Sequence, residues 1–144
     1  MTNLDLASIS RQAVQCRVCF DDLNIEPATI DIAQPRWVGP KYFSTKPRVL
    51  FVLLNPGSGE SRKGSADHEA LELLRNFRDN KGSLESVLRH QAKDMPNWGR
   101  GRFAKFYLDG LGLELDEIAF ANVAWCSARG NKYPSGMLRT CFEK

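Results

Sequence analysis

Four cysteines are the side chains in this sequence that most directly suggest chemistry, and they fall into two pairs. Cys16 and Cys19 form a C-x2-C motif, a spacing at which two thiolates can hold one metal ion or one edge of an iron–sulfur cluster. Cys126 and Cys141 follow much later in the chain. If all four converge, they tie both parts of the chain to one site. Because only the first pair has ligand spacing, four unrelated thiols, some buried as small hydrophobic side chains, remain the alternative.

Two asparagines stand beside apolar segments, where a buried amide is costly. Asn55 directly follows the apolar run 49–54, and Asn122 lies within the apolar run 117–125. A buried amide without partners costs about 1–3 kcal/mol, so each side chain needs hydrogen bonds. Both lie near the carboxyl ends of predicted strands, where ligand sites form in open parallel sheets. They are therefore candidates for binding a substrate; the alternative is that each amide caps a neighbouring loop.

The glycine-rich loop at residues 55–65, NPGSGESRKGS, fits phosphate-binding patterns only in part. A Walker loop requires Lys and then Ser or Thr after its second glycine, whereas Gly64 is followed by Ser65 and Ala66. A dinucleotide-binding loop requires a third glycine where Arg62 stands. Backbone N–H groups in such a turn can still contact a phosphate, which leaves nucleotide binding as an alternative.

Residues 97–107, NWGRGRFAKFY, combine basic and aromatic side chains. Arg100, Arg102 and Lys105 could contact a nucleic-acid backbone, and Trp98 could stack on a base. The alternative is an amphipathic helix with a basic face. At helical spacing, one face of residues 101–113 carries Phe103, Phe106, Tyr107 and Leu111.

The two histidines offer little for acid–base chemistry. His68 and His90 lie in polar stretches with helical periodicity, and neither has a cysteine or carboxylate at metal-ligand spacing. We therefore expect both rings to face solvent. The sequence contains no recognisable Ser–His–Asp or Cys–His arrangement for nucleophilic catalysis.

The elements that must position these residues alternate between helix and strand. Continuous apolar runs predict strands at 48–54 and 117–125, the first buried on both faces of a sheet. Residues 20–46, interrupted by prolines, are expected to form a wrapping loop. Helical periodicity is present at residues 6–15, 70–77, 84–90, 101–113 and 135–144. This order predicts a single α/β domain, residues 1–144, with a mainly parallel sheet.

Local signals also mark where helices begin and end. Ser83 and Ser135 are candidate N-caps, because a serine hydroxyl can accept a hydrogen bond from a backbone N–H of the first turn. Gly112 is expected to end the helix at 101–113, since glycine adopts the left-handed conformation without strain.

Composition limits the class of protein. With 42% hydrophobic and 26% charged residues, the chain is typical of a globular domain. No apolar stretch approaches the roughly 20 residues that span a bilayer, and the N-terminus lacks a secretory signal. We therefore expect a cytoplasmic monomer without a membrane partner. The net charge of +3 permits an anionic partner without requiring one.

The motifs in their order along the chain resemble the uracil-DNA glycosylase superfamily. The C-x2-C pair comes first, followed by the strand that ends in Pro56-Gly57 and by the helix between GRG at 99–101 and GLGL at 110–113. The final segment, NVAWCSARGNKYPSGMLRTC, is similar to the N-V-x-x-C…G-N-x-x-P…C signature of the iron–sulfur branch, with one residue fewer between its cysteines. The matching residues are Asn122, Val123, Cys126, Gly130, Asn131, Pro134 and Cys141.

The resemblance implies a cofactor and a fold. The cysteines lie where the iron–sulfur branch places its cluster ligands, which implies a [4Fe–4S] cluster held by Cys16, Cys19, Cys126 and Cys141, with zinc or no metal as alternatives. The implied fold is a three-layer α/β domain, a central mainly parallel sheet flanked by helices. The superfamily ends with a further strand and a His-Pro loop that stabilises the leaving base. Because neither histidine of this chain precedes a proline, we expect a domain that lacks its C-terminal part.

The strand loop departs from the iron–sulfur branch. Where that branch usually reads G-E-x-P-G, this chain reads Asn55-Pro56-Gly57, which resembles the mismatch-specific and single-strand-selective branches. The resemblance implies that Asn55 positions the attacking water. It also implies that Pro56, Gly57 and Ser58 line the substrate site.

The same resemblance implies how a base is read. Asn122 would donate to uracil O4 and accept from N3–H, a pattern that cytosine reverses. Trp98 or Phe103 would cover the flipped base. The expected function is hydrolysis of the N-glycosidic bond of uracil or a related damaged base in DNA, during base excision repair. The alternatives are a non-catalytic nucleic-acid-binding module of this fold, or a metal-stapled nucleotide-binding domain that uses the loop at 57–64.

Overall fold

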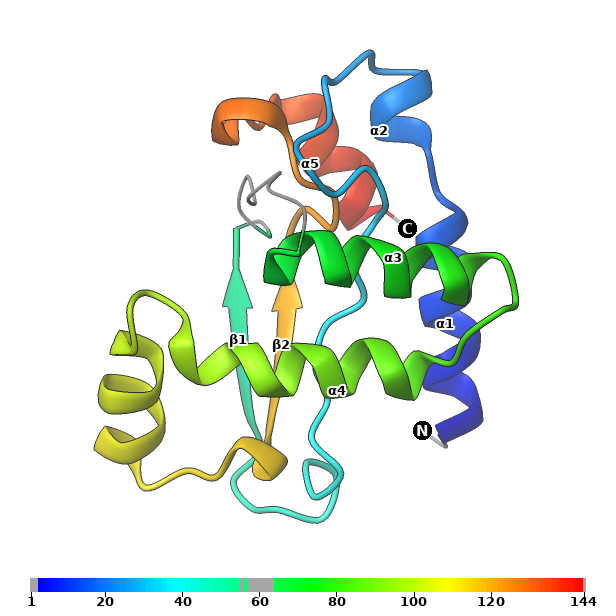
Figure 1. The fold of residues 1–144 in the computed structure, drawn as a ribbon. Helices are drawn as coiled ribbons and strands as arrows, with labels where there is room; N and C mark the ends of the chain where they lie inside the picture. Colours follow the sequence, from blue (N-terminus) through cyan, green and yellow to red (C-terminus); the bar gives the residue numbers. More distant parts are fainter. Residues whose placement is uncertain (1–2, 55, 57–63, 144) are drawn as a thin grey trace.

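A two-stranded parallel sheet forms the centre of the protein in the computed structural model, which describes residues 3–54, 56 and 64–143 (Figure 1). Strand β1 (Val49–Leu53) pairs with β2 (Ile118–Asn122). The helices are α1 (Asn3–Gln15), α2 (Val18–Asp21), α3 (Ala66–Arg78), α4 (Leu84–Asp94) and α5 (Ser135–Phe142). Shorter helical turns are η1 (Met95–Asn97), η2 (Ala104–Asp109), η3 (Leu115–Glu117) and η4 (Arg129–Asn131). The predicted α/β class with a parallel sheet is confirmed.

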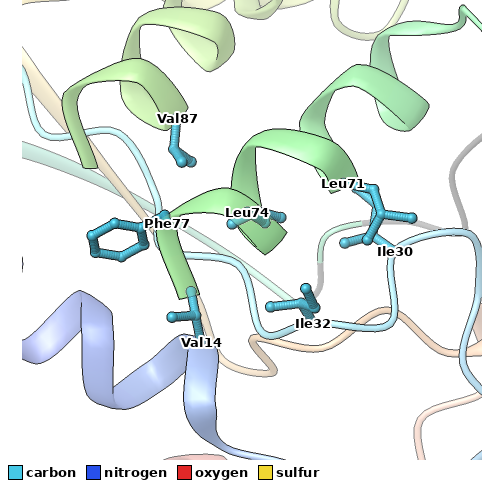
Figure 2. Packing of buried hydrophobic residues seen from close by; sticks show 7 residues of the cluster. All are labelled: Val14, Ile30, Ile32, Leu71, Leu74, Phe77 and Val87. Carbon is cyan, nitrogen blue, oxygen red and sulfur yellow. The ribbon is translucent and has the colours of Figure 1, made fainter. Parts of the chain in front are cut away.

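Amphipathic patterning places α3 and α4 side by side in front of the sheet (Figure 1). Ser83 caps α4 as predicted, because its hydroxyl accepts a hydrogen bond from Ser86 N at 3.2 Å. Ser65 caps α3 in the same way. The apolar faces of α1, α3 and α4 meet the wrapping loop in one core. Figure 2 shows its members, Val14, Ile30, Ile32, Leu71, Leu74, Phe77 and Val87.

Aromatic side chains form a second core between the sheet and the segment that follows α4. Phe51 of β1 stacks on Phe120 of β2 with 5.3 Å between ring centroids. Phe103 meets Phe120 edge to face at 5.1 Å, and Trp98 meets it at 5.4 Å. Such ring pairs contribute about 0.5–1.5 kcal/mol each beyond their buried area. One face of each strand packs against this core.

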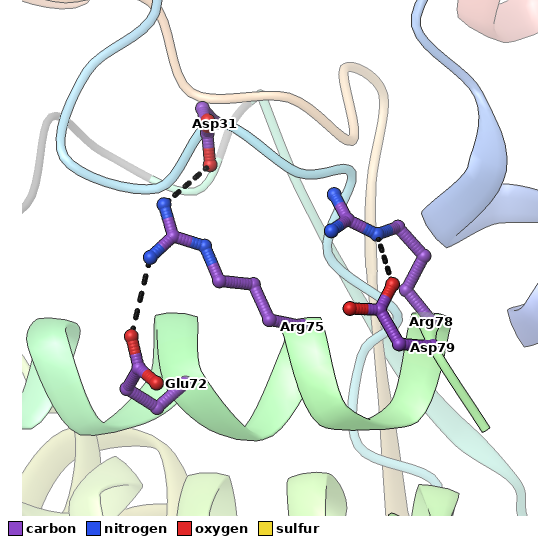
Figure 3. A network of polar contacts seen from close by, with 5 residues as sticks. All are labelled: Asp31, Glu72, Arg75, Arg78 and Asp79. Carbon is purple, nitrogen blue, oxygen red and sulfur yellow. Dashed lines mark hydrogen bonds and ion pairs between the residues drawn. The ribbon is translucent and has the colours of Figure 1, made fainter. Parts of the chain in front are cut away.

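The irregular segment between α2 and β1 wraps across the molecule, as predicted. Val38 forms an antiparallel bridge with Ala119, so β2 is paired on both of its edges. Figure 3 shows how α3 holds the segment: Arg75 reaches Asp31 at 3.7 Å and Glu72 at 3.2 Å. Exposed ion pairs of this kind contribute about 0–1 kcal/mol to stability. They therefore add little to the free energy that holds this segment against α3.

The prediction that the first strand is buried on both faces is wrong. Leu50, Val52 and Leu53 are 48%, 56% and 44% exposed. Among the described residues, β1 pairs with β2 alone and packs through only one face, on which Phe51 lies. The continuous apolar run therefore predicted the strand correctly, but it did not predict how much of the strand other residues would bury.

Two helix predictions need correction. Residues 104–109 are π-helical, and the wider turn breaks the predicted apolar face: Phe103 is buried, whereas Phe106 and Leu111 are each 59% exposed. Gly112, at φ 63°, does end this helix. Ser135 is the first residue of α5, not its cap. Pro134 occupies the cap position because its ring fixes a φ of −59° that leads directly into a helix.

Candidate functional site

The structure brings the two cysteine pairs together. Cys16 follows α1 and Cys19 lies in α2, whereas Cys126 follows β2 and Cys141 lies in α5. Contacts between α2 and α5 join these parts of the chain. The buried Cys19 thiol shares hydrogen bonds with Cys126 and with Cys141, and Cys16 is close enough to act on it electrostatically. Thiols from the two ends of the chain thus meet at one place.

The surroundings of Cys19 favour its protonated form. A hydrogen bond with Cys126 raises the pKa of Cys19 to about 12, and burial acts in the same direction. A hydrogen bond with Cys141 acts in the opposite direction. Because the thiolate is the form that binds metals, a metal or cluster must displace this proton.

A cavity of about 390 Å³ adjoins the cysteines, and Cys16, Cys126 and Cys141 line it. Within the described ranges, no group of three or more His, Cys, Asp or Glu side chains has the arrangement that a single metal ion requires. A [4Fe–4S] cluster requires a different arrangement of ligands. Each of its four irons takes one thiolate, so the thiolates lie around the whole cluster and not around a single ion. Three thiols line the cavity, and the buried Cys19 thiol lies behind them beside Cys126 and Cys141; four neighbouring thiols are the type of donor set that such a cluster uses.

Asn122 ends β2 and is 5% exposed. In the amide orientation that satisfies its hydrogen bonds, Nδ2 donates to Ala121 O at 3.0 Å. Its Oδ1 accepts from Nε and Nη2 of Arg36, each at 3.1 Å. Pro56 N lies 2.9 Å from the same oxygen but carries no hydrogen, so it cannot donate. The buried amide oxygen is therefore held by a cation.

Arg36 is a residue that the sequence did not single out. Burial lowers the pKa of its guanidinium to about 10, and the charge of Asp67 acts in the opposite direction. Arg36 therefore keeps its charge at neutral pH. Its guanidinium carbon lies 5.8 Å from the centroid of the Trp98 ring, within cation–π range. No sequence signal marks it, because its partner Asn122 lies far along the chain.

A smaller cavity of about 80 Å³ lies between α3, α4 and the wrapping loop, and Arg36, Pro56 and Trp98 line it. His90 lines it too, and the prediction that this ring faces solvent is wrong. Its side chain is 16% exposed, and its Nε2 lies 2.9 Å from Ala66 O. The packing of α4 against α3 turns the ring inward.

The two candidates for covering a base lie in different places. Trp98 lines the smaller cavity, and its Nε1 donates to Asp94 Oδ2 at 3.0 Å. Phe103 is 8% exposed and packs in the aromatic core, so it does not line this cavity. Trp98 is therefore the better-placed ring.

Three predicted site residues, Asn55, Gly57 and Ser58, lie outside the described residues. Their neighbours are placed: Leu53 stands opposite Asn122 in the parallel sheet. The carboxyl ends of the two strands therefore lie side by side, at the edge where ligands bind in such sheets.

Comparison with known proteins identified no related protein. No family model matches the chain, and neither a curated protein nor a solved structure matches it. None of the described helices has the length and hydrophobicity that crossing a membrane requires. Function must therefore be inferred from the residues and their geometry.

Proposed function

We propose that this chain is a uracil-DNA glycosylase-like protein that binds a [4Fe–4S] cluster. It would hydrolyse the N-glycosidic bond of a flipped uracil, or a related damaged base, in DNA during base excision repair. The observation that carries the proposal is the convergence of Cys16, Cys19, Cys126 and Cys141, which spacing alone left open. The resemblance of the motifs supplies the activity.

The role of the cluster in this proposal is structural. Bound through these four thiolates, it would cross-link α2 to α5 and to the loop after β2. That loop begins directly after Asn122, so the cross-link would steady the end of β2. Hydrolysis of a glycosidic bond transfers no electrons and does not need the cluster's redox chemistry.

Base recognition would use the carboxyl end of the sheet. A glycosylase takes its base out of the stack and reads it in a pocket, where the ring of Trp98 offers a flat wall. Asn122 lines neither of the two cavities described above, but its Nδ2 uses only one hydrogen on Ala121 O, which leaves the second for a carbonyl oxygen of a base at this end of the sheet. The sequence also suggested an acceptor role for Asn122, but Arg36 already occupies Oδ1. The proposal therefore keeps Asn122 as a donor.

Cleavage of the glycosidic bond leaves negative charge on the departing base. Donors fixed in a water-poor pocket lower the barrier to such a step. The amide of Asn122, with the charge of Arg36 directly behind it, can supply this stabilisation. Asn55 takes the role of holding the attacking water by resemblance.

The first test is the metal content of protein purified without oxygen. We expect a brown protein with about four irons per chain, and loss of the colour in Cys19→Ser. Thr140→Ala, a change beside Cys141 at a partly exposed position that removes no thiol, should keep the colour. A colourless protein with one zinc would contradict the cluster, and a metal-free protein would contradict both.

The second test is release of uracil from single- and double-stranded oligonucleotides. We expect Asn55→Ala and Asn122→Ala to lower the rate by about 10²-fold or more, as loss of a key donor or water-binding group does. Asn76→Ala, on the exposed face of α3, is the matched control and should leave the rate unchanged. Equal release by wild type and Asn55→Ala would contradict the role of Asn55, and no release at all would contradict catalysis.

A second candidate function is non-catalytic nucleic-acid binding. It is favoured by the exposed stretch that carries Arg100, Arg102 and Lys105, where Lys105 Nζ lies 5.6 Å from the centroid of the exposed Phe106 ring. Saturable DNA binding that weakens with salt, without base release, would support it. Replacing both arginines by alanine should weaken binding, whereas Arg89→Ala on α4 should not.

A further inference from the structure

Strand β1 has the sequence of a central strand but lies at an edge of the sheet. Residues 49–54 form a continuous apolar run, a pattern typical of parallel strands that are covered on both faces. In the structure, however, four of these side chains are each about half exposed: Leu50, Val52, Leu53 and Leu54. Within the described part of the chain, β1 pairs with β2 alone. Parallel sheets rarely leave such an apolar surface open to water, so we expect another element to cover it.

The open edge of β1 also carries backbone groups that a further strand would bind. Leu53 O accepts a hydrogen bond from Val123 N at 2.8 Å, so the backbone groups of Leu53 point toward β2. Because successive residues of a strand point their N–H and C=O groups to alternate edges, those of Leu50 and Val52 point away from β2. Another extended segment satisfies a row of such groups, so this surface fits a β-strand and not a helix or a nucleic acid.

Natural edge strands are usually guarded against such pairing, and β1 is not. A lysine, a proline or a bulge at an edge prevents two edges from meeting. The sequence has no charged residue and no proline between Arg48 and Pro56. The guanidinium of Arg48 is bound to the preceding loop, where its Nη2 donates to Phe43 O at 2.9 Å. The composition of β1 therefore does not oppose a second strand on this edge.

Strand β1 of a second copy of the chain is complementary to this edge. A two-fold axis beside Val52 would run the two strands antiparallel, with Val52 facing Val52 of the second copy and Leu50 facing its Leu54. Apolar side chains would then meet across the strands, which stabilises their pairing. Arg48 would lie opposite Pro56 of the second copy, so the two arginine charges stay at opposite ends, whereas parallel strands would bring them together. The combined sheet would reach about four strands, a usual size for a sheet.

We propose that two copies of this chain pair through the open edges of their β1 strands and form one continuous sheet in which β1 is central. Two short strands make a small interface, and small interfaces are typically weak, so the dimer forms at high concentration and dissociates on dilution. This dimer replaces the monomer expected from the sequence. It does not depend on the proposed glycosylase function, because it is measured without DNA.

The test is sedimentation of the full chain, purified without oxygen, from micromolar to millimolar concentration. Hydrogen exchange of backbone amides is followed by nuclear magnetic resonance on the same samples. We expect the mass to rise from that of one chain to that of two as the concentration increases. The amides of Leu50 and Val52 should exchange several-fold more slowly in the concentrated sample, because they would then donate to the second copy.

Opposite charges at position 52 make the test specific to this edge. Val52→Lys and Val52→Glu each place like charges opposite one another at the two-fold axis, so each variant alone should dimerise at least about tenfold more weakly. An equimolar mixture of the two variants should restore the dimer, because unlike charges then meet. Leu23→Lys, which places a charge at a partly exposed apolar position outside the sheet, is the control and should dimerise like wild type.

Three results would overturn the inference. A single-chain mass up to millimolar concentration would leave the edge to a different partner. Slow exchange of the Leu50 and Val52 amides at every concentration would show that another part of the same chain covers the edge. A dimer that keeps fast exchange at these amides, or that Val52→Lys does not weaken, would use a different surface.

Discussion

The two strands are both apolar in sequence, yet they have different surroundings. In β2 every residue except Ala121 is buried, whereas Leu50, Val52 and Leu53 of β1 are about half exposed. β2 has partners on both edges, because the wrapping loop adds backbone hydrogen bonds on the side away from β1. Within the described ranges, β1 has its strand partner on one edge only. Position in the sheet, more than composition, decides how much each strand stabilises the fold.

The largest expected effect lies inside β2. Ile118 is fully buried, and Ile118→Ala should lower the free energy of unfolding by about 2–5 kcal/mol through lost contacts and a residual cavity. Leu50→Ala, the control in β1, should cost about 1 kcal/mol or less because half of the side chain is already in water. Denaturant unfolding followed by circular dichroism measures both. Equal losses would contradict the distinction between the strands.

The second edge of β2 can be disturbed at Gly39, whose N–H donates to Ile118 O at 2.9 Å. A Cβ at this position would lie 2.2 Å from Asp116 O, so Gly39→Ala must push the wrapping loop away from the strand. We expect a loss of about 1–3 kcal/mol and faster hydrogen exchange at Phe120 N, which donates to Trp37 O.

Gly136→Ala is the matched control for this change. Its Cβ would meet only the Leu23 side chain at 3.8 Å, an ordinary contact, and the position is helical. Alanine there should raise stability by about 0.4–1 kcal/mol. If Gly39→Ala were equally harmless, the wrapping loop would not be holding the edge of β2.

The polar end of β2 offers a third test. Asn122→Ala would leave the buried Arg36 without its amide acceptor, at an expected cost of about 1–3 kcal/mol. A double-mutant cycle with Arg36→Met should give a coupling free energy of about 0.5–3 kcal/mol, because each variant removes the same hydrogen bonds. Additive effects in urea unfolding would mean that the two side chains do not act as a unit.

The smallest effect is expected on the open face of β1. Val52→Thr changes a side chain that is 56% exposed and should alter stability by no more than about 0.5 kcal/mol. The same substitution at Val87, which is 2% exposed, buries a hydroxyl in the helical core and should cost about 1–3 kcal/mol. A loss at Val52 as large as that at Val87 would show that this face is covered in solution.

Local features were predictable because they depend on neighbours along the chain. The apolar runs indicated both strands, the 3.6-residue period indicated α3 and α4, and Ser83 and Gly112 mark helix ends as expected. Errors arose where another part of the molecule intervenes. The π-helical turn at 104–109 and the inward ring of His90 depend on packing that no local pattern encodes.

The sequence by itself determined which residues carry chemistry: four cysteines in two pairs, and an asparagine at the end of an apolar strand. Only the tertiary structure decided that the cysteine pairs meet and that Arg36 holds Asn122. The physical reason is distance along the chain. Each of these arrangements joins segments that folding brings together, and the spacing of residues in a sequence does not record which distant segments will touch.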